Sequence, residues 1–131
     1  MSKMFFPQAA RRALPIGPAP RAVVLDDDPD QCMNLLLYLS QVGFSVVIAH
    51  NLADALSVIE RDAPRLAVLR RRRNLPEGSG AVLAKTISPD LQIIETADRE
   101  ESILAGDGVP LLARPVSIAS FDQALTSLGV V

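Results

Sequence analysis

The sequence predicts an α/β domain built on a doubly wound parallel sheet, and two observations carry that prediction. From residue 21 onward, short apolar runs alternate with helical patterns, which is typical of βαβ units. These runs are continuously apolar rather than alternating, as expected for strands that helices cover on both faces. The five expected strands are 22–25, 44–49, 66–69, 91–95 and 109–112.

The first expected helix has clear signals at both ends. Asp28 before Pro29 predicts an N-cap with proline at the first helical position, and Gln31 is expected to return to the cap. Gly43 is expected to end the helix. The apolar stripe that should face the sheet consists of Cys32, Leu35, Leu36 and Leu39.

The other helices are predicted in the same way. Asn51 and Ser117 are expected to cap the second and the last helix, and Gly129 lies just beyond the last. A third helix is expected to begin near Ser79 and to end before Pro89. Only about two turns fit between 98 and 105, so the helix before the fifth strand is expected to be short.

The chain of 131 residues is long enough for one domain, and we expect it to comprise residues 21–131. Four prolines interrupt residues 1–20, which we interpret as a flexible tail. An alternative is that Met4-Phe5-Phe6 anchors this tail in a groove.

Charge and composition exclude several classes of function. The net charge is −2, which gives no general attraction to nucleic acid or anionic membranes. No apolar run approaches the ~18 residues of a membrane span, and the N-terminus has no signal-peptide core. Cys32 is the single cysteine, which excludes an intrachain disulfide and favours a small core residue in a reducing cytoplasm.

Polar and charged residues follow most of the expected strands. Asp26, Asp27 and Asp28 follow the first strand, four arginines (70–73) follow the third, Thr96 follows the fourth, and Arg114-Pro115 follows the fifth. Because the carboxyl ends of parallel strands form the functional crevice of open sheets, these residues are the candidate site.

These motifs resemble the receiver domain of two-component response regulators, over about residues 21–131. Asp26 and Asp27 match the acidic pair that helps to hold Mg²⁺, and residues 75–80 match the turn after the phosphorylated aspartate. Thr96 matches the switch residue, and Arg114-Pro115 matches a Lys-Pro pair that is usually joined by a cis peptide bond. The resemblance implies a flavodoxin-like (βα)5 fold with strand order 2-1-3-4-5.

The chain departs from this family at the phosphoacceptor position. Counting back from Pro76 places Arg72 there, which we prefer, whereas counting forward from Pro64 places Arg70 there. A guanidinium stays protonated and cannot act as the nucleophile. It also disfavours Mg²⁺, which needs about six oxygen ligands, so we expect no metal and no cofactor.

Two neighbouring carboxylates about 4 Å apart repel each other by roughly 4 kcal/mol at an effective dielectric constant of about 20. We hypothesise that an arginine fork on Asp26 or Asp27 relieves this repulsion in place of the metal. The alternative is that residues 70–73 form a solvated basic loop, whose ion pairs would contribute little.

Three further residues receive structural interpretations. The Thr96 hydroxyl is expected to be satisfied by the backbone, Asp98 to cap a helix, and His50 to have a surface or capping role. No Ser/His/Asp set, GxGxxG or phosphate-binding loop is present, so no enzymatic activity is expected.

The family likeness implies a stand-alone pseudo-receiver that acts by protein contact without aspartyl phosphorylation. Its expected partners are a histidine kinase, a phosphotransfer protein or another regulator, with a homodimer possible and with neither nucleic acid nor membrane. One alternative is an anion-binding or nucleotide-binding module that uses residues 70–73 and Arg114. Nucleic-acid binding through residues 70–73, and phosphorylation of Asp26 or Asp27, are the remaining alternatives.

Overall fold

The computed structural model describes residues 19–71, 79–98 and 109–130. Its elements in chain order are β1 (Arg21–Leu25), α2 (Pro29–Val42), β2 (Ser45–Ala49), α3 (Leu52–Asp62), β3 (Leu66–Arg70), α4 (Ser79–Ile87), β4 (Gln92–Ala97), β5 (Leu111–Ala113) and α5 (Ile118–Leu128). The strands form one parallel sheet in the order β2-β1-β3-β4-β5. The predicted fold class and strand order are therefore confirmed. The helix expected to be short falls within 99–108, outside the described residues.

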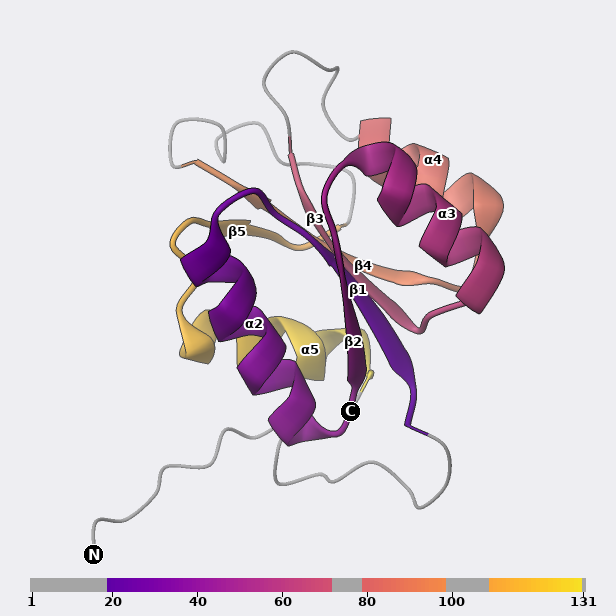
Figure 1. Cartoon of the computed structure of the whole chain (residues 1–131). Helices are drawn as coiled ribbons and strands as arrows, with labels where there is room; N and C mark the ends of the chain where they lie inside the picture. The colour runs from indigo at the N-terminus through magenta and orange to yellow at the C-terminus, as the bar shows by residue number, and fades with distance from the viewer. Residues whose placement is uncertain (1–18, 72–78, 99–108, 131) are drawn as a thin grey trace, which may run out of the picture.

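Helices cover both faces of the sheet (Figure 1). On one face, Val24, Val68 and Ile94 pack with side chains of α2 and α5. On the other, Val23, Ala67 and Ile93 pack with side chains of α3 and α4. Successive strand residues thus enter opposite halves of the core, and this double burial explains why the strands are apolar throughout.

Strand boundaries differ from the predicted ones by one or two residues because ladder pairing, rather than hydrophobicity, sets them. The run at 109–112 forms a strand only from Leu111, which is opposite Glu95 on β4. Phe44 is buried just before β2, and Leu91 is buried just before β4. Apolar residues thus pack into the core beyond the ends of the hydrogen-bonded strands. Hydrophobicity alone does not distinguish such residues from those within a strand.

The predicted caps of three helices are present. The Asp28 side chain accepts from the Asp30 amide, that of Asn51 from the Asp54 amide, and that of Ser117 from the Ser120 amide. The helices α2 and α5 end at the predicted glycines, Gly43 at φ 118° and Gly129 at φ 70°, where residues other than glycine are strained.

The expectation that Gln31 returns to the cap of α2 is wrong. The Gln31 Oε1 atom instead accepts a hydrogen bond of 3.0 Å from the backbone of Val116, and the Asp28 amide donates to Asp26 Oδ1. Gln31 is buried, and at this position it satisfies a backbone group of the segment before α5. The side chain therefore fastens the start of α2 to the C-terminal part of the chain.

The predicted stripe of α2 is only half right. Leu35 and Leu39 are buried, together with Tyr38 and Val42, but Cys32 and Leu36 are half-buried. The prediction that Cys32 is a core residue is therefore wrong, because Cys32 lies in the wall of a pocket at the start of the helix. None of the described helices is long and apolar enough to cross a membrane.

Candidate functional site

The carboxyl ends of four neighbouring strands bring the candidate residues together. Leu25 of β1 lies opposite Leu69 of β3, and Arg70, which ends β3, lies opposite Thr96 of β4. Asp26 follows β1 directly, and Arg114 follows β5 directly. The sequence prediction that these residues converge at one edge of the sheet is borne out by this register.

Arg114 binds Asp26 through two parallel hydrogen bonds. Its Nη2 atom lies 2.8 Å from Asp26 Oδ1, and its Nε atom lies 3.2 Å from Oδ2. The Asp26 side chain is 1% exposed and that of Arg114 is 12% exposed. Since Asp26 Oδ1 also accepts from the Asp28 amide, both oxygens of this buried carboxylate are engaged by the protein.

Arg70 joins two further carboxylates to the same network. Its Nη1 atom donates to Asp27 Oδ1, and its Nη2 atom lies 3.4 Å from Asp98 Oδ2. Asp98 also receives Arg114, whose Nη1 atom lies 3.3 Å from Oδ1. Asp98 thus bridges two guanidinium groups, a role that its interpretation as a helix cap missed. The helix that it would have capped lies outside the described residues.

The charges of the network favour the ionised forms of Asp27 and Arg114. Burial alone would raise the pKa of Asp27, but the hydrogen bond and the charge of Arg70 outweigh it and hold the pKa below its usual value. For Arg114, burial acts to lower the pKa, whereas Asp26 and Asp98 raise it, with a net increase. Carboxylates and guanidiniums therefore stabilise one another as charged groups.

Arg71 faces the opposite half of the core from Arg70 and forms a buried ion pair. Its Nη2 atom lies 2.8 Å from Glu95 Oε1, with side chains that are 6% and 3% exposed. The alternative of a solvated loop is therefore wrong for Arg70 and Arg71. Arg72, the preferred phosphoacceptor position, lies outside the described residues, as does Arg73, so that preference stays a prediction.

Glu95 was missed by sequence reasoning, although a signal was present. A carboxylate in a strand that helices cover on both faces must find a cation or be neutralised, because an isolated buried charge is very costly. Glu95 ends the apolar run 91–95, and an arginine run follows the neighbouring strand. The combination predicts a partner, but not which arginine supplies it.

The Thr96 side chain is not satisfied as expected. It is fully buried, and its hydroxyl makes no hydrogen bond within the described part of the chain, so the expectation of a backbone partner is wrong. The Thr96 carbonyl does accept from the Arg71 amide at 2.7 Å. Nearby, the peptide bond between Arg114 and Pro115 is cis.

Comparison with known proteins gives a consistent result for the fold. A receiver protein from Sinorhizobium medicae superposes with a TM-score of 0.70 at 21% identity, over 84% of this chain and 94% of that one. The non-phosphorylated HemR receiver domain from Leptospira biflexa gives 0.63 at 24% identity, over 83% and 93%. The anti-anti-sigma factor PhyR from Bartonella quintana gives 0.66 at 19% identity, over 94% of this chain and 53% of PhyR.

The chain has the fold of a response regulator receiver domain. No protein-family model and no curated protein matches the sequence significantly, so the likeness is one of structure. The residues that distinguish this chain lie at two strand ends: Asp26 and Asp27 follow β1, and Arg70 ends β3. The receiver fold is thus present, with arginines among its strand-end acids.

A Mg²⁺ ion of the receiver type does not fit the residues that are present. Arg114 and a backbone amide occupy both oxygens of Asp26, and Arg70 occupies Oδ1 of Asp27. Two guanidinium charges also stand where a divalent cation would need to approach. In the described ranges, no group of three potential ligands is placed to hold a metal ion.

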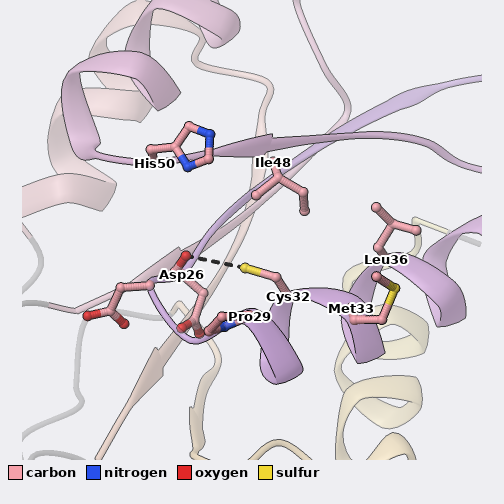
Figure 2. A pocket seen from close by; sticks show the side chains of 8 residues that line it. Asp26, Pro29, Cys32, Met33, Leu36, Ile48 and His50 are labelled. Atoms are coloured by element: carbon pink, nitrogen blue, oxygen red, sulfur yellow. Dashed lines mark hydrogen bonds between the residues drawn. The ribbon is translucent and has the colours of Figure 1, made fainter.

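A pocket of about 440 Å³ opens beside these acids, between the start of α2 and the end of β2. Figure 2 shows Cys32, Met33 and Leu36 on its α2 side and Ile48 and His50 across from them. The Cys32 thiol donates to the Asp26 carbonyl at 3.2 Å. Burial, followed by the charges of Asp26 and its neighbours, raises the pKa of this thiol, so it is a poor nucleophile. His50 is exposed, in agreement with its predicted surface role.

Proposed function

We propose that this protein is a degenerate receiver domain that acts by binding another protein, without phosphorylation of an aspartate. One observation carries the proposal: the guanidinium groups of Arg70 and Arg114 bind Asp26, Asp27 and Asp98. Arg70 ends β3 against Thr96, and for this reason we propose that Arg70, rather than Arg72, occupies the phosphoacceptor position.

The contacts of the acids argue against a substitute phosphoacceptor. A carboxylate nucleophile needs a free oxygen that the phosphodonor can approach. Asp26 is 1% exposed and has both oxygens bonded, so it offers no such oxygen. The Asp27 side chain is 72% exposed, but Arg70 binds its Oδ1 atom and holds the carboxylate in an ion pair. In the receiver family a metal offsets the charge of the incoming phosphoryl group, whereas the three carboxylates here face two guanidinium groups and keep a net negative charge.

The same contacts support a site that is held in one arrangement. Arg114 ties the end of β5 to the end of β1, and Arg70 ties the end of β3 to both Asp27 and Asp98. A switch requires two arrangements that differ by a few kcal/mol and a ligand that discriminates between them. The Arg114–Asp26 pair, with side chains that are 12% and 1% exposed, favours the arrangement that contains it, whether or not a phosphodonor is present.

Exposed apolar side chains provide surface for a protein partner. Met33 and Leu37 on α2 are 53% and 57% exposed, and Val82 and Leu83 on α4 are 60% and 47% exposed. The two pairs lie on helices that cover opposite faces of the sheet, so each is a separate surface that a partner could cover. PhyR is an anti-anti-sigma factor, and a contact between proteins is likewise what we propose here. A second copy of the chain and a sensor kinase are both candidate partners.

Mass spectrometry after incubation with acetyl phosphate and Mg²⁺ tests the proposal. The wild type is expected to gain no phosphoryl mass, and its affinity for a cognate kinase or phosphotransfer protein is expected to be unchanged by the donor. The double variant Arg70→Asp, Arg114→Lys restores a third carboxylate and a compact cation, and it is expected to gain Mg²⁺ affinity in calorimetry. A phosphoryl adduct on the wild type would contradict the proposal.

The contacts do not favour the alternative of anion or nucleotide binding. Within the network, two guanidiniums face three carboxylates, so the local charge is already negative. An incoming phosphate would have to displace a carboxylate from Arg70 or Arg114. We therefore expect phosphate and nucleotides to leave the melting temperature unchanged. An increase in the melting temperature with either would support anion or nucleotide binding instead.

A further inference from the structure

The pocket beside Asp26 combines an apolar lining with a carboxylate at its edge. Its lining residues are Asp26, Asp27, Pro29, Cys32, Met33, Leu36, Ile48 and His50. Figure 2 shows the apolar side chains directed toward a common space. The Met33 residue is 53% exposed, and the Asp27 side chain is 72% exposed. Because removing apolar surface from water is favourable, this open hollow of about 440 Å³ is a candidate site for apolar side chains.

The sequence contains a segment with the complementary properties. Of the five aromatic residues, Tyr38, Phe44 and Phe121 are buried in the core. The other two, Phe5 and Phe6, fall within residues 1–18, which precede the described domain. They follow Lys3 and Met4, so a cation is joined to three bulky apolar side chains. Apolar residues of this size need a partner surface to be buried.

Charge distinguishes this pocket from a second large hollow in the described part of the chain. The chain has 13 basic and 15 acidic residues, and residues 1–18 hold three of the basic ones and none of the acidic ones. The rest of the chain therefore has ten basic against fifteen acidic residues. The broad groove of about 820 Å³ between α2 and α5 has no charged side chain in its lining. The pocket edged by Asp27 is the one that matches a lysine.

The connection is long enough for docking within one molecule. Residues 7–18 join Phe6 to Ala19 and can span up to about 40 Å when extended. The distance along the sheet from Ala19 to Asp26 is about 23 Å, because each strand residue advances about 3.3 Å. A tether of this length gives an effective local concentration on the order of 1 mM.

We propose that Lys3-Met4-Phe5-Phe6 docks into this pocket of its own chain. The aromatic rings occupy the space between Met33, Leu36 and Ile48, and the Lys3 ammonium pairs with the exposed carboxylate of Asp27. Sulfur atoms of Cys32 and Met33 line the same space and provide favourable contacts for aromatic rings. The proposal is independent of the proposed function, because it does not require any state of phosphorylation.

The rate of Cys32 alkylation measures occupancy of the pocket. Cys32 is the only cysteine, so iodoacetamide labelling of the full chain reports on this one position. Docking in about nine molecules of ten would slow labelling roughly tenfold relative to the full-length double variant Phe5→Ser, Phe6→Ser, equivalent to about 1.4 kcal/mol. The matched control is Leu14→Ser, Ile16→Ser, which removes apolar residues from the same segment and is expected to label at the wild-type rate.

Three results would overturn the proposal. Equal labelling rates in the wild type and in the phenylalanine variant would show that the pocket is not covered by these residues. Protection that increases with protein concentration would show that a second copy supplies the segment. As a second readout, nuclear Overhauser contacts are expected between the Phe5 or Phe6 ring protons and the Met33 methyl group. Their absence in the wild type would also refute docking.

Discussion

Replacing Arg71 by methionine should destabilise the domain severely. The change removes the cation from Glu95 while it preserves much of the apolar volume of the arginine stem. At the observed 2.8 Å, the gross attraction at an effective dielectric constant of about 20 is roughly 6 kcal/mol. Most of this attraction offsets the cost of removing both charges from water. When Arg71 is lost, Glu95 still pays this desolvation cost without a partner. The expected cost is therefore about 3–5 kcal/mol.

Urea denaturation followed by circular dichroism measures this cost. With a denaturant slope of about 2 kcal/mol per M, the midpoint should fall by roughly 2 M. Adding Glu95→Leu to Arg71→Met should restore most of the loss, because an apolar pair replaces an orphaned charge. The matched control is Arg61→Met, whose pair with Asp62 lies at the surface with the arginine 65% exposed, and which should cost less than about 1 kcal/mol.

The physical reasoning fails under two outcomes. If Arg71→Met lowers the free energy of unfolding by less than about 1 kcal/mol, the Arg71–Glu95 pair is not held in a low-dielectric environment. If the double variant is as unstable as Arg71→Met alone, the loss comes from the packing of Arg71 rather than from the charge of Glu95. The cycle between the two positions thus separates charge from shape.

Three further outcomes are expected. A carbon-13 titration should find the Asp27 pKa below its ordinary value near 3.9. The stabilising contact with Arg70 should therefore be complete above the ordinary pKa and be lost as the pH falls through the lowered pKa. The variant Arg70→Gln should move the Asp27 pKa upward. Burial and the hydrogen bond to Asp122 raise the pKa of Tyr38, the only tyrosine in a chain without tryptophan, so absorbance at 295 nm should stay flat through pH 10. Gly43→Ala should cost about 1 kcal/mol or more in thermal unfolding, because φ is 118° at this cap, and a cost near zero would contradict the role of the glycine.

The fold could be predicted from the sequence because its signals are local. Runs such as 66–69 are apolar without alternation, and Asp28, Asn51 and Ser117 cap helices through atoms only two or three residues away. Gln31 is the exception that shows the limit. Its local pattern fits a capping box, but a backbone amide 85 residues later competes for the same side chain and wins.

The partners within the site were less predictable because they depend on which face each residue occupies. The sequence indicated that arginines meet acids, and it identified Asp26 and Arg114 as members of the site. It could not indicate that Arg114, rather than a member of the 70–73 run, forms the two-pronged contact with Asp26. Nor could it show Asp98 between two guanidiniums, since that requires the ends of β3, β4 and β5 to be in register.

The opposite orientations of Arg70 and Arg71 have a consequence for how the chain tolerates changes in length. Arg70 and Arg71 point to opposite faces of the sheet and pair with Asp27 and Glu95, respectively. A shift of the chain by one residue would therefore normally bring a different side chain to each partner. In a stretch of four identical residues, loss of one or even two codons still leaves arginine at both places. The two ion pairs can therefore persist after a deletion that would replace one of the arginines in a run of mixed residues.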